Sequence, residues 1–117
     1  MIIGTGIDII EVSRVERAMA RWGDAFLHHL FSEDEIAYAR SNKYPQQHFA
    51  ARFAAKEAIL KAIGDIDHIT WKDMEIRKHP NGQPYCVFKQ GDFPYKILIS
   101  ISHTKNYAVA NAIVTSE

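Results

Sequence analysis

The stretch that most constrains how this chain can fold is residues 52–64, RFAAKEAILKAIG. It predicts a helix, because alanine and straight-chain residues dominate it and a glycine is placed to end it. At about 100° per residue, apolar side chains cover most of the circumference. They are Phe49, Phe53, Leu60 and Ile63 on one side, and Ala51, Ala55, Ala58, Ile59 and Ala62 on much of the other. Such a helix is normally buried, and its alanines let neighbouring backbones come close.

Two charged residues are set into this apolar surface. Glu57 and Lys61 lie four residues apart, about 40° around the helix axis. They are either an ordinary i,i+4 pair, worth ~0.2–0.5 kcal/mol, or charges that need partners elsewhere, since an unpaired buried ion is costly. Asp8 is a similar case, because it lies in an apolar segment with isoleucines on both sides, and aspartate is a poor strand former. It predicts either a structural salt bridge or a metal-binding or catalytic carboxylate.

Length, charge and cysteine content limit the class of protein. The 117 residues suit one domain spanning 1–117, and 14 basic residues balance 14 acidic ones, so non-specific nucleic-acid binding is not favoured. Cys86 is the only cysteine, with no disulfide partner and no zinc-ligand spacing, which is typical of a reducing compartment. The first residues form no basic segment, and no apolar run is long enough to cross a membrane. We therefore expect a cytoplasmic protein without membrane association.

The N-terminal segment predicts a strand. Residues 2–10 are β-branched and apolar, which indicates a strand that is apolar on both faces and hence central in a sheet or well covered. The Gly4-Thr5-Gly6 sequence is not a dinucleotide-binding loop, because Ile9 stands where the third glycine belongs and no helix starts there.

A helix with two different faces should follow this strand. A capping box from Ser13 to Glu16 predicts that it begins at Ser13, and Gly23 should end it. Its buried side is predicted to carry Val12, Val15, Met19 and Trp22. Its exposed side carries a basic stripe of Arg14, Arg17 and Arg21. Such a stripe is usually a solvated face, but it also suits the docking of an acidic protein surface.

The rest of the chain changes from helices to strands. Residues 25–31 predict a short helix, a second capping box runs from Ser32 to Glu35, and Pro45 suits the first position of the central helix. Period-two patterns then predict two hairpins, with strands at 71–79, 85–89, 95–102 and 107–115 and turns at 80–84, 90–92 and 103–106. The predicted fold is α+β: an N-terminal strand, a helical block around a long central helix, and an antiparallel sheet of C-terminal hairpins.

Asp8 and Glu57 together indicate a cation site. They lie on different elements of one predicted core, where like charges both stay ionised only if a cation joins them. Two oxygen ligands without a histidine or cysteine cluster favour Mg²⁺ over zinc. Mg²⁺ held in this way normally completes its coordination with waters and substrate phosphates, and Lys61 would add positive charge for a phosphate oxygen.

Several motifs in combination resemble one family. They are Gly6-Ile7-Asp8-Ile9, residues 52–58 with Lys61, Gly82 and Pro84 in the predicted turn, and Ser100-Ile101-Ser102-His103. In this order and spacing, over essentially the whole chain, they are similar to the small 4′-phosphopantetheinyl transferases. The resemblance implies the fold of that family. It also implies transfer of the 4′-phosphopantetheine arm of coenzyme A to a serine of apo acyl carrier protein, with release of adenosine 3′,5′-bisphosphate, in support of fatty acid biosynthesis.

The resemblance also implies roles for residues near the reacting phosphate. Asp8 and Glu57 match the positions that hold Mg²⁺ against the coenzyme A diphosphate, and Lys61 matches the lysine beside that phosphate. These three residues are the catalytic candidates. The general base stays open: Glu57 acting through a water held by the metal is favoured over His103 acting directly.

Further positions are carried over for binding. Those expected near coenzyme A are Arg52, Lys61, Gly82, Pro84 and His103. Those expected to meet the acidic carrier protein are Arg14 first, then Arg17 and Arg21. The family resemblance also implies a homotrimer with active sites between subunits.

Two other functions are compatible with parts of this pattern. A Mg²⁺-dependent hydrolase of a diphosphate compound would use the same carboxylates with water as the acceptor, but it gives the arginine stripe no purpose. A non-catalytic module that binds an acidic protein would use the stripe and leave Asp8 and Glu57 in salt bridges. Nucleic-acid binding is disfavoured by the zero net charge and by the lack of a basic, aromatic-lined strand face.

Overall fold

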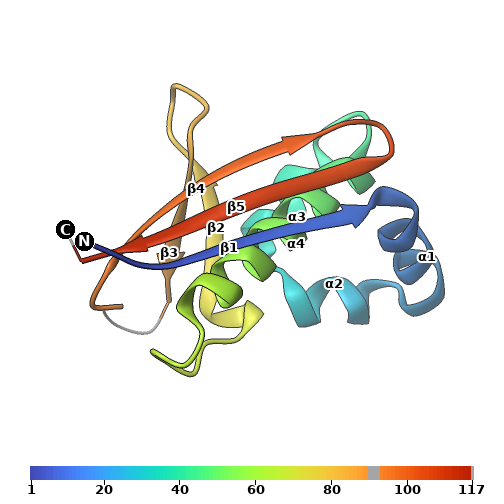
Figure 1. The fold of residues 1–117 in the computed structure, drawn as a ribbon. Coiled ribbons are helices and arrows are strands. Elements are labelled where there is room, and N and C mark those ends of the chain that lie inside the picture. The colour runs from blue at the N-terminus through green and yellow to red at the C-terminus, as the bar shows by residue number, and fades with distance from the viewer. Residues whose placement is uncertain (90–92, 117) are drawn as a thin grey trace.

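The computed structural model describes residues 1–89 and 93–116, and it confirms the predicted α+β class (Figure 1). The helices are α1 (Val12–Trp22), α2 (Asp24–Leu30), α3 (Glu33–Arg40), α4 (Pro45–Ile63) and the short 3₁₀ helix η1 (Trp71–Asp73). The strands are β1 (Ile2–Glu11), β2 (Met74–Lys78), β3 (Pro84–Phe88), β4 (Lys96–His103) and β5 (Tyr107–Thr115). The turn predicted at 90–92 lies outside the described residues.

The strands form two antiparallel sheets. One sheet has the order β1-β5-β4, so the N-terminal strand pairs with the last strand, and Asp8 lies opposite Ala110. The other sheet is the hairpin of β2 and β3. The prediction that the first strand is central or well covered is wrong for a single chain. It is an edge strand, and Ile7 and Ile9 on its outer face are 64% and 66% exposed, because α4 covers only the inner face.

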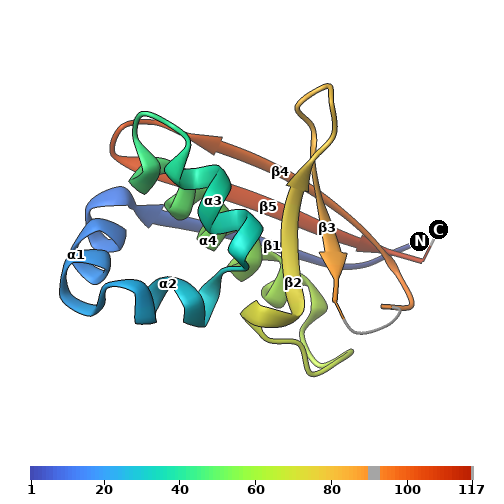
Figure 2. The ribbon, with the colours of Figure 1, turned by 180° about the vertical axis from the view of Figure 1, so that it is seen from behind.

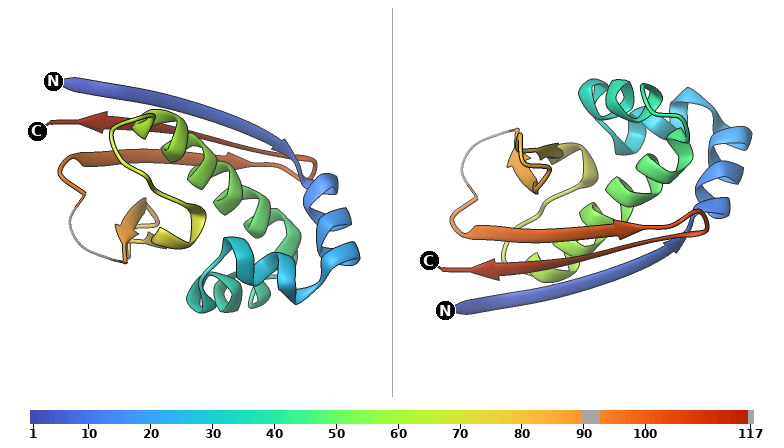
Figure 3. Two further views of the ribbon diagram at one scale, coloured as in Figure 1. Left: turned by 90° about the horizontal axis from the view of Figure 1, so that it is seen from below. Right: turned by 90° about the horizontal axis from the view of Figure 1, so that it is seen from above.

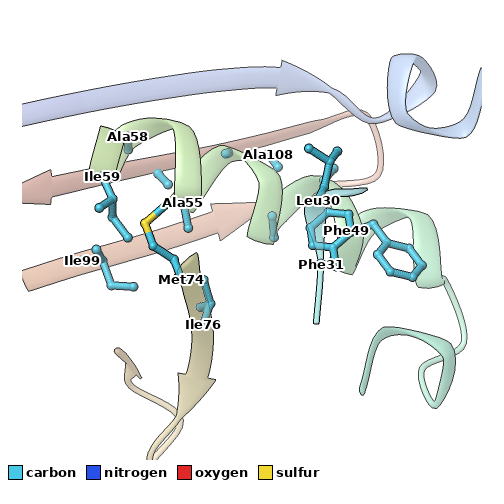
Figure 4. Close-up of a cluster of buried hydrophobic side chains, with 14 of the residues drawn as sticks. Leu30, Phe31, Phe49, Ala55, Ala58, Ile59, Met74, Ile76, Ile99 and Ala108 are labelled. Atoms are coloured by element: carbon cyan, nitrogen blue, oxygen red, sulfur yellow. The ribbon is translucent and has the colours of Figure 1, made fainter. Parts of the chain in front are cut away.

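Helix α4 lies in the middle of the molecule. The three-stranded sheet packs on one side of it, while α3 and the β2–β3 hairpin lie on the other (Figures 2 and 3). Its apolar circumference is buried as predicted: Ala55 and Ile59 lie near Met74 and Ile99 in the core, and Phe49 packs against Phe31 nearer the start of the helix (Figure 4). Burial of apolar surface from both sides stabilises this arrangement by about 25 cal/mol per Å².

Two glycines bring α4 against β1. A Cβ atom on Gly4 would lie 2.0 Å from the carbonyl oxygen of Ala62, and one on Gly6 would lie 2.0 Å from that of Ala58. Both distances are far below van der Waals contact, so no side chain fits at either position. The glycines therefore set the separation between the strand that carries Asp8 and the helix that carries Glu57.

The predicted signals at the ends of α3 and α4 are confirmed, whereas the one predicted for α1 is wrong. Pro45 begins α4, Gly64 with φ of 55° follows its end, and Ser32 and Glu35 form the predicted capping box of α3. The capping box predicted at Ser13 is wrong. Helix α1 begins at Val12, directly after β1, and among residues 1–89 and 93–116 no side chain caps it.

A backbone contact takes the place of the missing cap, and two further expectations near these elements are wrong. The backbone N–H of Val12 donates to the Asn106 carbonyl at 2.8 Å, so the β4–β5 turn replaces a cap. Trp22 is exposed rather than buried, with the Arg21 guanidinium 4.9 Å from its ring centre. Residues 71–73 form η1 instead of a strand, because Asp73 accepts hydrogen bonds from the backbone and hydroxyl of Thr70.

Candidate active site

A cavity of about 350 Å³ lies between β1, α1 and α4. It is lined by Asp8, Ile9, Ile10, Arg14, Val15, Ala18, Phe26, Phe53 and Glu57. Asp8 enters it from the middle of β1, and Glu57 enters from α4, one turn after Phe53. The two carboxylates predicted to act together thus share one cavity, and Arg14 of the basic stripe reaches the same space.

Lys61 joins the two elements at this cavity. Its ammonium Nζ donates to the carbonyl oxygen of Ile7 at 2.9 Å and lies 3.3 Å from Oδ1 of Asp8. The Lys61 side chain is 57% exposed whereas that of Asp8 is 18% exposed, so the lysine approaches the aspartate from the solvent side. A partly exposed pair of this kind contributes little to stability, about 0–1 kcal/mol. Its ammonium group therefore remains available to an anionic ligand.

Glu57 lies in a setting that disfavours its charge. Burial, followed by the nearby negative charge of Asp8, raises the pKa of Glu57 above its usual range. Lys61 and the indole N–H of Trp71 act in the opposite direction and lower that pKa. A cation beside both carboxylates would remove their mutual repulsion, so the site is electrostatically suited to bind one.

The residues present fit Mg²⁺ better than a transition metal. Among residues 1–89 and 93–116, no group of three or more histidine, cysteine, aspartate or glutamate side chains could hold a metal by itself. Asp8 and Glu57 offer only oxygen atoms, and Mg²⁺ is commonly held by one or two carboxylates together with substrate phosphates. Zinc would need more protein ligands, usually nitrogen or sulfur.

The residue next to Glu57 is in the opposite situation. Lys56 and Glu35 are 0% and 1% exposed, and the Lys56 Nζ lies 2.8 Å from Oε1 of Glu35. The same ammonium donates to the carbonyls of Leu30 at 2.8 Å and Trp71 at 3.1 Å, which uses all three of its protons. This buried ion pair is fully hydrogen-bonded, and it fixes the rotation of α4 that turns Glu57 toward Asp8.

A second cluster of charged and aromatic side chains lies elsewhere on α4. The Arg52 guanidinium stacks 4.2 Å from the ring centre of Tyr38, and the Tyr38 hydroxyl accepts from Lys78 at 2.9 Å. His48 packs edge-on against both Tyr38 and His103, with ring centres 5.6 Å and 5.2 Å apart. We call Arg52, Tyr38, His48, Lys78 and His103 the cationic cluster.

The cationic cluster favours an anionic ligand. Desolvation, followed by the charges of His103, Arg52 and Lys78, lowers the pKa of His48. Arg52 is almost fully buried, and its Nε has no hydrogen-bond partner among the described residues. An anion bound beside these side chains would relieve the repulsion between the cations.

The predicted site residues thus fall into two groups. The first group, at the carboxylate cavity, is Asp8, Arg14, Glu57 and Lys61. The second group, at or beside the cationic cluster, is Arg52, His103, Pro84 and Gly82; Pro84 pairs with Lys78, and Gly82 lies in the β2–β3 turn. Arg17 and Arg21 are exposed on α1 but do not line the cavity.

Four residues of these surroundings were missed by sequence reasoning. They are Tyr38, His48, Trp71 and Lys78. Their positions depend on contacts between α3, α4 and the β2–β3 hairpin, and no local spacing indicates those contacts. His48 gave a weak signal at most, since it lies one turn before Arg52 on the same helix.

Comparison with known proteins identifies the family. The profile of the 4′-phosphopantetheinyl transferase superfamily matches residues 4–112. The chain belongs to this superfamily. The matched residues include both carboxylates of the cavity and every residue of the cationic cluster. Both groups therefore lie within the region that these transferases share.

Relatives within the superfamily extend the similarity over the whole chain. Holo-[acyl-carrier-protein] synthases of Koribacter versatilis and Thermodesulfovibrio yellowstonii are each 44% identical, over 97% and 98% of this chain and 98% and 100% of theirs. The structure of the Bacillus anthracis holo-(acyl-carrier-protein) synthase in complex with CoA (3′,5′-ADP) matches with a TM-score of 0.86 at 35% identity, covering 100% of this chain and 99% of that one. The Helicobacter pylori synthase in complex with coenzyme A matches at 0.83 and 28% identity, covering 95% and 99%.

Proposed function

We propose that this phosphopantetheinyl transferase is a holo-[acyl-carrier-protein] synthase, which moves the 4′-phosphopantetheine group of coenzyme A to a serine of apo acyl carrier protein. The observation that carries the proposal is the cavity shared by Asp8 and Glu57 with Lys61 beside it, in a chain 44% identical to named synthases. Two carboxylates and an available ammonium suit a diphosphate bound with a divalent cation.

The reaction places distinct demands on the side chains of the cavity. The serine oxygen attacks the phosphorus that bears the pantetheine arm, and the bond from that phosphorus to adenosine 3′,5′-bisphosphate breaks. Asp8 and Glu57 would hold Mg²⁺, which when bound neutralises diphosphate charge. Lys61 Nζ donates to a phosphate oxygen as negative charge develops.

Glu57 is the proposed acceptor of the serine proton. Burial, the larger cause of its raised pKa, favours the protonated carboxyl, and a carboxylate that gains a proton readily suits a general base. His103 belongs to the cationic cluster and does not line the cavity in the same chain. A direct role for His103 therefore requires a second copy of the chain.

The cationic cluster is the proposed site for an anionic part of coenzyme A. Arg52 and Glu57 are five residues apart, about 140° around the axis of α4, so the cluster and the cavity face different directions. One coenzyme A molecule would bridge the two groups only if they came from neighbouring chains. This geometry supports a homotrimer with shared active sites.

The outer face of the three-stranded sheet is the proposed trimer contact. Ile7, Ile9, Leu98 and Tyr107 are large and exposed on β1, β4 and β5, and none of the helices in the described part of the chain covers this face (Figure 3). An exposed apolar face of this kind usually marks an interface. The expected particle mass is three times the 13.3 kDa of the chain, and Ile7→Lys should reduce it to one chain and lower the transfer rate.

The decisive test measures the intact mass of apo acyl carrier protein after incubation with this protein, coenzyme A and Mg²⁺, with and without EDTA. We expect a mass gain of one phosphopantetheine that EDTA abolishes, and loss of that gain in Asp8→Asn. Release of adenosine 3′,5′-bisphosphate without a mass gain would indicate a hydrolase instead. No change in either molecule would favour a non-catalytic binding module.

Arg14 is the proposed first contact with the acidic carrier protein, followed by Arg17 and Arg21. Arg14→Glu should raise the KM for carrier protein about tenfold, equivalent to ~1.4 kcal/mol, because it reverses a charge at the cavity rim. Smaller increases are expected for Arg17→Glu and Arg21→Glu, which lie away from the cavity. The KM for coenzyme A is the internal control, and an unchanged carrier KM in Arg14→Glu would remove the docking role.

The setting proposed for this activity is the cytoplasm, with fatty acid biosynthesis as the process it supports. Within the described residues, none of the helices is both long and apolar enough to span a bilayer.

A further inference from the structure

Two positive charges from different elements meet at a second cavity. Arg52 of α4 and Lys78 of β2 line a space of about 320 Å³ between α3, α4 and β2. Arg52 is 4% exposed, and within the described residues neither it nor Lys78 forms a salt bridge with a carboxylate. Like charges that share a cavity repel, and a buried cation without a partner is costly, so another group must hold the two side chains in place.

The carboxylates at this cavity leave both cations without a neutralising partner. Glu35 forms the buried ion pair with Lys56, and Glu75 is bound by the Arg77 guanidinium at 2.6 Å. Asp34 is exposed on α3 and, in the part of the chain that the structure describes, has no salt-bridge partner. The cavity therefore contains two cations whose charge is available to an anionic ligand.

Tyr38 is the side chain that contacts both cations. The Arg52 guanidinium lies 4.2 Å from the centre of the Tyr38 ring. The Lys78 Nζ donates to the Tyr38 hydroxyl at 2.9 Å and lies 5.4 Å from the same ring centre. The face of an aromatic ring attracts a cation, and a hydroxyl accepts a hydrogen bond while it stays uncharged. Tyr38 can therefore hold both cations without cancelling the charge of either one.

We propose that Tyr38 is a positioning residue, an uncharged partner that holds Arg52 and Lys78 side by side so that both cations can bind one phosphate group. The inference rests on the proposed function, in which the cationic cluster receives an anionic part of coenzyme A. A carboxylate in this place would also hold the cations, but it would compete with the phosphate for them. Long cationic side chains that are already ordered lose less conformational entropy when the ligand binds, so the contribution of Tyr38 should appear as affinity.

The test is a double-mutant cycle between Tyr38 and Lys78. Adenosine 3′,5′-bisphosphate is the probe, and its binding is measured by isothermal titration calorimetry in EDTA, so that no divalent cation contributes. We expect Tyr38→Phe to bind the probe about threefold more weakly and Lys78→Met about tenfold more weakly. The double variant should bind it as Lys78→Met does, because the hydroxyl has already lost the ammonium that it positions. A purely structural effect of the hydroxyl would instead multiply with that of Lys78.

A second pair of variants tests the ring of Tyr38. Tyr38→Leu removes both the ring and the hydroxyl, so we expect it to bind the probe about tenfold more weakly than the unaltered protein does. Tyr95→Leu is the matched control, because Tyr95 is also half-buried and packs against Phe93, and among the described residues no cation lies over its ring. It should leave the affinity unchanged. Tyr38→Phe keeps the ring and so tests the inference even where Tyr38→Leu fails to fold.

The outcomes separate this inference from the proposed function. Unchanged affinity in Tyr38→Phe or in Lys78→Met, or effects of the two that multiply in the double variant, would overturn the role of Tyr38 alone. Failure of the unaltered protein to bind adenosine 3′,5′-bisphosphate would overturn the proposed anion site and the inference with it. In turnover assays, Tyr38→Phe should raise the KM for coenzyme A while the KM for carrier protein stays the same.

Discussion

Lys56 and Glu57 are neighbours on α4, and their two environments differ in whether the charge is satisfied within the chain. Lys56 is fully buried against Glu35, and all three of its protons are used in hydrogen bonds. Glu57 faces Asp8 across a cavity, where burial and the like charge raise its pKa. A charged group whose hydrogen bonds are all made within the chain has a structural role. A charged group that repels its neighbour across a cavity is suited to bind a ligand.

The same contrast predicts different effects for substitutions in the buried ion pair and for substitutions of the two carboxylates at the cavity. Removing one member of a complete buried pair leaves an uncompensated charge, so the loss appears in stability. Removing one of two repelling carboxylates relieves strain in the protein without ligand, so the loss appears in binding and rate. The following substitutions test this distinction, from the largest expected effect to the smallest.

Lys56→Met should lower the free energy of unfolding by about 3–5 kcal/mol, because Glu35 then stays buried without its cation. Chemical denaturation monitored by circular dichroism measures the change. Lys61→Met is the matched control, since Lys61 lies on the same helix but is 57% exposed, and it should change stability by less than about 1 kcal/mol. Equal losses in the two variants would remove the structural distinction between the two lysines.

Gly6→Ala should lower the free energy of unfolding by about 1–3 kcal/mol, because the new methyl group would overlap the Ala58 carbonyl and push α4 away from β1. The displacement should also weaken Mn²⁺ binding, since it separates Asp8 from Glu57. Thermal denaturation and Mn²⁺ titration together measure both effects. Thr5→Ala, on the outer face of the same strand, is the control, and a stable Gly6→Ala protein would contradict the close approach.

Of these substitutions, Glu57→Gln should change the free energy of unfolding least. It should also alter how that free energy depends on pH. Because the folded-state pKa of Glu57 is raised, the folded protein retains this proton to higher pH than the unfolded chain. Its contribution to stability is therefore present at low pH and is lost as the pH rises through the raised pKa. In EDTA, Glu57→Gln should lose less stability than the unaltered protein between about pH 4 and about pH 7.5.

Urea denaturation at the two pH values measures this difference, with Glu16→Gln on the exposed side of α1 as the matched variant. Mg²⁺ should stabilise the unaltered protein at the higher pH and leave Glu57→Gln unchanged, because a ligand that binds only the folded state adds to stability. A larger pH loss in Glu57→Gln than in the unaltered protein would show that the sign of the argument is wrong.

Local sequence determined the elements of this protein and the chemistry of its carboxylates. The composition of residues 52–64 requires a buried helix, and period-two patterns predict the four C-terminal strands, three of which keep nearly the predicted bounds. Asp8, Glu57 and Lys61 stood out because each places a charge in an apolar pattern, and the structure brings the three together at one cavity. The combination of motifs also indicated the superfamily.

Only the tertiary structure decided which charge on α4 is paired and which faces open space. Lys56 and Glu57 are adjacent in sequence, but their partners Glu35 and Asp8 come from elements 21 and 49 residues away, by the difference of their numbers. The exposed outer face of β1 and the separation of Arg52 from the cavity depend on similar long-range packing. Side-chain spacing describes one element at a time, whereas burial and electrostatics are set by the elements that fold against it.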